Sequence, residues 1–207
     1  MSKINKKIII ATGGTGGHIF PAVSLTNFLI KNGFNTIVTT DKRGSKFIDR
    51  KYVQKIILID SSPLNKNRRF ISFIKIILAI LNSFVFLIKN KPRFIFGMGG
   101  YASFPVCFAA VILRIPFIVY ENNLLVGKSN KYLLPFAKKI FVSYEDIQGI
   151  NFKYKNKIKI TGNILRESIL NYSKINKDVS LQKLNILVLG GSQAAKIFAE
   201  KLPDTFI

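Results

Sequence analysis

The chain has 207 residues, of which 48% are hydrophobic and 12% aromatic, so it holds enough apolar material to bury a sizeable core. Its one cysteine, Cys107, excludes internal disulfides and fits a reducing cytoplasm. The net charge of +22 would suit a polyanion, but Lys and Arg are spread along the chain without a nucleic-acid-binding motif, which excludes nucleic acid as the expected partner. An AT-rich genome explains the level of charge, and an anionic membrane surface would explain local clusters.

Apolar strand-like runs alternate with helical patterns along the whole chain. We predict strands at 7–11, 34–39, 55–59, 93–96, 116–119, 139–143, 157–160 and 185–189. We predict helices at 19–32, 44–51, 70–89, 103–113, 128–137, 164–172 and 194–201. This alternation indicates an α/β fold with a mostly parallel sheet. Segment 173–184 has no clear period and is typical of a linker, so an amino-terminal domain is expected over residues 1–163.

The first predicted strand opens directly into a glycine-rich loop, Thr12–Gly17, that precedes a helix. Such a loop exposes backbone N–H groups, and the start of a helix favours phosphate. The loop fits neither a Walker loop nor the dinucleotide fingerprint, since His18 and Ile19 stand where those motifs need other residues. His18, the chain's only histidine, is placed to take a proton from a bound hydroxyl, or else to cap the helix or bond a loop carbonyl.

Two further strands are predicted to end in glycine-rich loops. The second loop spans Gly97–Ser103, and the third contains Gly190, Gly191, Ser192 and Gln193. Because the carboxyl ends of parallel strands lie at one edge of a sheet, all three loops would meet where ligands bind in open α/β folds.

Five segments in order resemble one family: GGTGGHIFPA (13–22), GMGGYASFPV (97–106), YENN (120–123), GNILR (162–166) and GGSQAA (190–195). Together they are similar to the MurG family of bacterial glycosyltransferases. The resemblance implies a GT-B fold with a cleft between two Rossmann-like domains. It implies transfer of N-acetylglucosamine from its UDP donor onto undecaprenyl-diphospho-N-acetylmuramoyl-pentapeptide, which converts lipid I to lipid II for peptidoglycan. The expected mechanism is a single inverting displacement.

The resemblance implies a role for each matching residue. Thr15, Gly16 and Gly17 would contact the UDP-sugar, although their chemistry also suits the acceptor diphosphate. His18 would be the catalytic base. The other expected substrate-binding residues are Gly99, Gly100 and Tyr101 for the acceptor diphosphate, Asn123 for a sugar or ribose oxygen, Arg166 for a diphosphate oxygen pair, and Ser192 and Gln193 for the donor diphosphate. The alternative for Asn123 is a turn residue after the preceding strand, and for Arg166 a surface ion pair with Glu167 or another acid. No Asp-x-Asp motif or His/Cys cluster occurs, so we expect neither a metal site nor a cofactor.

The sequence departs from the family pattern at four points. Tyr120 replaces a histidine, Ile164 and Leu165 replace Pro-Val, and Ala194 replaces a glycine. The chain stops at Ile207, whereas the family continues for roughly another domain of about 150 residues. Residues 164–184 would then be a connecting helix and linker, and 185–207 the first strand, loop and helix of an incomplete UDP-sugar-binding domain.

The stretch Phe70–Ile88 is apolar except for Lys75 and has cations on both flanks, namely Lys66, Arg68, Arg69, Lys89 and Lys91. It could span a membrane, pack in the core, or lie with one face on the sheet and another in lipid. We favour the third, because Lys75, Asn82 and Ser83 weaken a span. The resemblance implies the same peripheral location, on the cytoplasmic face of the inner membrane.

Two other functions stay open. One is a dinucleotide-binding oxidoreductase, because Gly97-x-Gly99-x-x-Ala102 fits a loose fingerprint and Glu121 ends the next strand. The other is an inactive chain or half-enzyme that binds the acceptor and needs a separate donor-domain chain.

Overall fold

The computed structural model describes residues 6–60, 69–172 and 200–201. The chain divides into two compact units, residues 1–171 and 172–207. The predicted strand 185–189 and the third glycine loop, with Ser192 and Gln193, lie outside the described residues. Of the predicted helix 194–201, only Glu200 and Lys201 are described, and both are helical. The predicted boundary at residue 163 stays a prediction.

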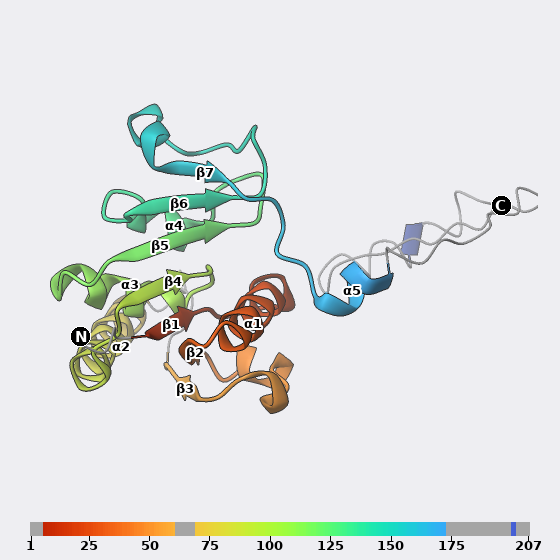
Figure 1. Cartoon of the computed structure of the whole chain (residues 1–207). Helices are drawn as coiled ribbons and strands as arrows, with labels where there is room; N and C mark the ends of the chain where they lie inside the picture. Colours follow the sequence, from red (N-terminus) through yellow and green to blue (C-terminus); the bar gives the residue numbers. More distant parts are fainter. Residues whose placement is uncertain (1–5, 61–68, 173–199, 202–207) are drawn as a thin grey trace, which may run out of the picture. The chain divides into compact units, whose positions relative to one another are not determined.

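The first unit is built on a seven-stranded parallel sheet with the order β3-β2-β1-β4-β5-β6-β7 (Figure 1). Its strands are β1 (Lys7–Ala11), β2 (Asn35–Thr40), β3 (Ile56–Leu58), β4 (Phe94–Gly97), β5 (Phe117–Glu121), β6 (Lys139–Val142) and β7 (Ile158–Ile160). Every pairing is parallel, which confirms the predicted α/β sheet. The strand order reverses between β1 and β4, and open α/β sheets bind ligands at such a point.

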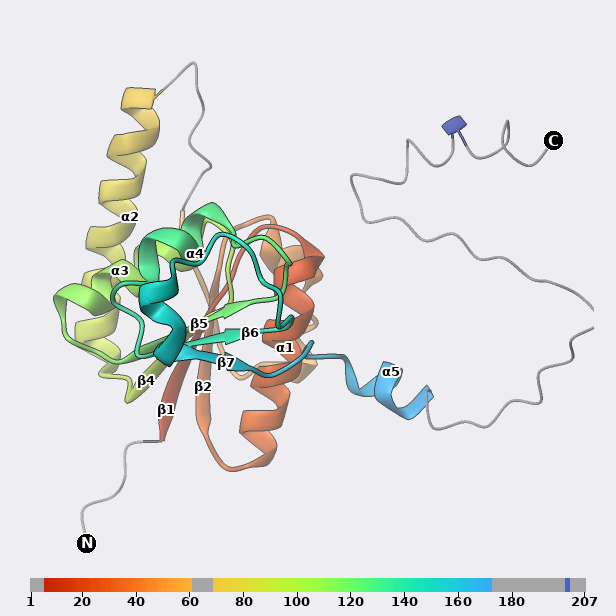
Figure 2. The same ribbon diagram turned by 90° about the horizontal axis from the view of Figure 1, so that it is seen from above.

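Helices cover both faces of this sheet (Figure 2). They are α1 (Gly16–Lys31), α2 (Arg69–Asn90), α3 (Ser103–Ile112) and α4 (Lys128–Leu133). A further helix, α5 (Glu167–Tyr172), has no buried residue and joins neither core. Successive side chains of a strand point to opposite faces. Ile8 and Ile10 of β1 therefore pack with α1, while Ile9 and Ala11 join the core made by α2, α3 and α4.

Several predicted helices have different bounds. The predicted helix 44–51 is wrong, since this segment forms two short 3-10 turns, η1 (Gly44–Phe47) and η2 (Arg50–Tyr52). The side chain of Asp49 accepts a hydrogen bond from the N–H of Lys51, a local bond that competes with helix continuation. Helix α1 begins at Gly16 rather than residue 19, so the last loop glycines form its first turn. A third 3-10 helix, η4 (Phe152–Lys157), precedes β7 and was not predicted.

Helix α2 buries one narrow face and exposes a wide apolar one. Its buried side chains are Ser72, Ala79, Ser83 and Leu87. Its exposed ones include Phe70, Phe73, Leu78 and Leu81, with 76%, 59%, 53% and 55% of their surface accessible. Over the described part of the chain, Phe70–Asn90 is the one helix long and apolar enough to cross a membrane, and 22% of its apolar window is buried. This pattern excludes the fully buried core helix.

Because α2 is buried on one side only, alanine substitutions of two of its leucines should differ greatly in their effect on the free energy of unfolding. Leu87→Ala should lower the free energy of unfolding by about 2–5 kcal/mol, because it opens a cavity at a fully buried side chain. The matched control Leu81→Ala, at an exposed position, should change it by less than about 0.5 kcal/mol. Urea unfolding followed by circular dichroism measures both. Equal losses would contradict this packing of α2.

Candidate active site

The first glycine loop joins β1 to α1 and is fixed by a carboxylate from another loop. Gly14 has a φ of +87°, in the left-handed region that glycine adopts without strain. Its N–H donates to Oδ1 of Asp41 at 3.1 Å, and the same oxygen accepts from the N–H of Gly44 at 2.8 Å. The hydroxyl of Thr12 donates to the carbonyl of His18 at 3.1 Å. Because first-turn amides lack an acceptor within their helix, Gly16 and Gly17 can donate to a ligand.

The second glycine loop follows β4 and lies directly against the first. Gly100 has a φ of +81°, and a Cβ at this position would overlap the carbonyl oxygen of Gly13. A Cβ on Gly13 would in turn lie 2.7 Å from the Cβ of Ala102. Glycine is needed at both positions for close approach of the two backbones. The predicted meeting of the first two loops at the carboxyl edge is confirmed.

His18 lies between these two loops. A Cβ on Gly99, whose φ is +88°, would lie 2.8 Å from Nδ1 of His18, so the imidazole packs against the second loop. Within the described residues, Nδ1 is buried and has no hydrogen-bond partner. Burial lowers the pKa of His18 from 6.5, and the negative charge of Glu121 and the backbone of Met98 partly oppose this. His18 is therefore neutral at pH 7, as a general base must be.

Glu121 ends β5 and organises the segment that follows. Its carboxylate is fully buried and accepts hydrogen bonds from the N–H and Nδ2 of Asn123 at 3.1 and 2.8 Å. It also accepts from the N–H of Gly127 at 2.8 Å and from Nδ2 of Asn130 at 2.9 Å. The neighbouring Asn122 donates from Nδ2 to the carbonyl of Gly17 at 2.8 Å, which joins this segment to the first loop.

The oxidoreductase interpretation is wrong at this residue. It requires the Glu121 carboxylate to face a ribose, but both oxygens are engaged inside the protein. Sequence reasoning missed the structural role of Glu121, and it missed Asp41 and Asn130 altogether. A charged residue that ends a wholly apolar strand, as Glu121 does, was the available signal.

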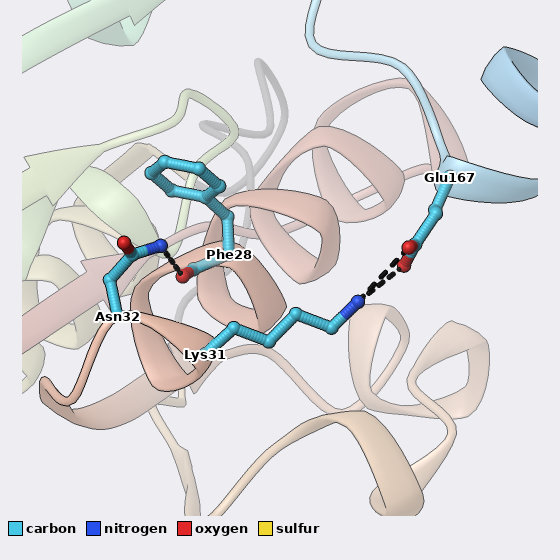
Figure 3. Close-up of polar contacts among 4 residues, drawn as sticks. All are labelled: Phe28, Lys31, Asn32 and Glu167. Carbon is cyan, nitrogen blue, oxygen red and sulfur yellow. Dashed lines mark hydrogen bonds and ion pairs between the residues drawn. The ribbon is translucent and has the colours of Figure 1, made fainter.

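Arg166 is brought to α1 from a distant part of the chain. Its Cζ lies 4.6 Å from the centroid of the Phe20 ring. The neighbouring Glu167 pairs with Lys31 of α1 at 2.8 Å, as Figure 3 shows, so the ion pair considered between Arg166 and Glu167 is replaced by another. The structure thus places Thr15, Gly16, Gly17, His18, Gly99 and Gly100 at one edge. Asn123 bonds to Glu121 within its own segment, and Arg166 contacts Phe20 of α1. Tyr101 is 42% exposed in the second loop.

The part of the chain that the structure describes contains no group of three or more His, Cys, Asp or Glu side chains that could hold a metal ion. The polar groups of the candidate site include the loop backbone amides, the imidazole of His18 and the exposed guanidinium of Arg166.

Many families place glycine loops at the switch point of a parallel α/β domain, and comparison with known proteins identifies the family here. Residues 8–142 match the family model described as the glycosyltransferase family 28 N-terminal domain, and the chain belongs to this family. It is similar to the UDP-N-acetylglucosamine–N-acetylmuramyl-(pentapeptide) pyrophosphoryl-undecaprenol N-acetylglucosamine transferase of Pelagibacter ubique, at 40% identity over 99% of this chain and 57% of that protein. The protein of the same name from Rickettsia canadensis is also 40% identical, over 96% of this chain and 55% of that protein.

The solved structure of MurG from Acinetobacter baumannii has the same fold, with a TM-score of 0.72 and 24% identity over 97% of this chain and 56% of that one. These shares show that the chain spans a little over half the length of its relatives.

Proposed function

We propose that this chain is the acceptor-binding part of an enzyme that transfers N-acetylglucosamine from UDP-N-acetylglucosamine to undecaprenyl-diphosphate-linked N-acetylmuramoyl-pentapeptide. The observation that carries the proposal is the neutral His18 held between two glycine loops. Both named relatives catalyse this transfer according to their names, and their similarity extends over nearly all of this chain.

The reaction would be a single displacement. The muramoyl hydroxyl attacks the anomeric carbon of the donor sugar, its proton passes to Nε2 of His18, and the bond to the UDP oxygen breaks. The departing diphosphate gains negative charge, which donors aimed at it stabilise. Asp41 already occupies the N–H of Gly14, so Thr15, Gly16 and Gly17 remain to bind the UDP-sugar. Gly99, Gly100 and Tyr101 would bind the acceptor diphosphate, Asn123 a sugar oxygen, and Ser192 and Gln193 the donor diphosphate.

We also propose that the domain works at the cytoplasmic face of the inner membrane. The exposed apolar face of α2 would enter the lipid interface, and Lys75 and Lys89, both exposed, would meet anionic headgroups. This would bring the carboxyl-edge site to an acceptor whose lipid tail stays in the bilayer.

The alternative of a half-enzyme that needs a separate donor-domain chain stays a prediction. An assay of the chain with and without an added donor domain from a relative tests this alternative. Transfer by the chain alone would contradict the half-enzyme interpretation.

His18→Ala is expected to lower kcat by about 10²–10⁴ with little change in donor KM, because a general base accepts the proton in the transition state and does not bind the donor. Burial lowers the pKa of His18, so the pH at which activity falls to half on acidification should lie below 6.5. A transfer assay with labelled UDP-N-acetylglucosamine and a lipid I analogue, with any missing donor domain supplied, measures this. Phe28→Leu, at an exposed position of the same helix, is the control. Turnover near wild type in His18→Ala would remove His18 from the mechanism.

Membrane docking through α2 can be tested by vesicle sedimentation. Phe73→Ser together with Leu81→Ser should reduce binding to vesicles rich in anionic lipid, and raising the salt concentration should release much of the wild-type protein. The control Phe28→Ser removes an equally exposed ring from α1, on the opposite face of the sheet, and should bind normally. Unchanged binding of the double variant would contradict the docking surface, and resistance to carbonate extraction would indicate a spanning helix.

A further inference from the structure

One aromatic ring contacts both the first glycine loop and Arg166. Phe20 lies in the second turn of α1, and a Cβ on Gly16 would come within 2.7 Å of its Cε2 atom. The guanidinium carbon of Arg166 lies over the same ring, 4.6 Å from its centroid. The ring of Phe47 packs against Phe20 edge-on, with centroids 6.3 Å apart. Phe47 thus holds the ring of Phe20 in place, and Arg166 lies over the same ring.

The backbone around Arg166 is fixed on both sides of that residue. The hydroxyl of Tyr120 accepts from the N–H of Ile164 at 3.1 Å and lies 3.3 Å from the carbonyl of Gly162, to which it donates. One residue beyond Arg166, the carboxylate of Glu167 pairs with Lys31. Ile164 packs against the core under α1. These contacts bring the backbone of residue 166 close to α1. The position of the Arg166 side chain is then set by its contact with the ring of Phe20.

Stacking leaves the hydrogen-bonding capacity of the guanidinium intact. A planar guanidinium uses its face for an aromatic ring and its edge for hydrogen bonds. Arg166 is exposed, so its N–H edge can reach a ligand while its face rests on Phe20. An arginine already held in place loses less conformational entropy when an anion binds. A lysine, as a point charge without a plane, would not be held in this way.

We propose that Phe20 is a positioning residue for diphosphate binding, because its ring holds the Arg166 guanidinium beside the first glycine loop. The guanidinium and the amides of Gly16 and Gly17 then act on one diphosphate. This inference rests on the proposed function, in which Arg166 binds a diphosphate, and adds the residue that orients it.

The test is a titration of the full 207-residue chain with inorganic pyrophosphate, followed by NMR at the amides of Gly16 and Gly17 and at Nε–H of Arg166. Phe20→Leu should weaken binding roughly three- to tenfold, whereas Phe20→Tyr, which keeps the ring face, should bind as wild type. Phe20→Leu should cause no further loss in an Arg166→Ala background, since it acts through that arginine. Phe28→Leu, elsewhere on α1, is the matched control and should have no effect.

A second readout reports the stacking directly. The side-chain protons of Arg166 should show a ring-current shift in the wild type and in Phe20→Tyr that is lost in Phe20→Leu. Unchanged amide signals of Gly97–Gly100 and an unchanged thermal midpoint would show that Phe20→Leu folds. If it does not fold, the ring-current shift and the wild-type affinity of Phe20→Tyr still test the proposal.

The outcomes distinguish the diphosphate-binding role of Arg166, which belongs to the proposed function, from the positioning role of Phe20. If Arg166→Ala weakens binding but Phe20→Leu does not, the positioning role is overturned and the proposed diphosphate role of Arg166 stands. If Arg166→Ala binds pyrophosphate as wild type does, or the wild type does not bind it, both fail. An Arg166 signal without a ring-current shift would also overturn the positioning role.

Discussion

The close approach of two backbones at the carboxyl edge of the sheet sets the geometry of the whole site. Gly13 and Gly100 face each other where neither position has room for a Cβ. Their contact joins the loops that follow β1 and β4, the two neighbouring strands that flank the switch point. It also sets His18 against Gly99, which removes water from the imidazole and lowers its pKa. Backbone packing and acid–base chemistry therefore have one origin here.

Two carboxylates hold this arrangement from within. Asp41 joins the first loop to η1, and Glu121 ties the end of β5 to Asn123, Gly127 and Asn130. A buried charge is costly unless its lone pairs are filled, and hydrogen bonds to charged groups contribute about 1.5–3 kcal/mol each. Four such bonds make the segment after β5 a rigid part of the site. The negative charge of Glu121 also raises the pKa of His18 and so partly opposes the effect of burial.

The sequence predicted what local patterns determine. Apolar runs ending in glycine clusters were sufficient for the strands β1 and β4, their loops and the parallel sheet. The sequence did not predict contacts between residues that are far apart in the chain. The bond from Gly14 to Asp41 and the stacking of Arg166 on Phe20 depend on how the chain returns to α1, which no local pattern encodes. The helix expected at 44–51 failed because Asp49 makes a local bond that a periodicity count ignores. The roles assigned to all the site residues, from His18 as the base to Asn123, Ser192 and Gln193 as substrate ligands, stay predictions.

The central claim is that the carboxyl edge of this sheet binds a diphosphate-linked sugar. Amide chemical-shift mapping with a short-chain, soluble lipid I analogue tests it most directly. The account predicts shifts at Thr15–Gly17, Gly99–Tyr101 and Asn123. The opposite edge offers a natural comparison, because a polar cavity there is lined by residues that include Lys7, Thr36, Gln54 and Lys55. Shifts confined to that amino-terminal edge, with none at the glycine loops, would contradict the account.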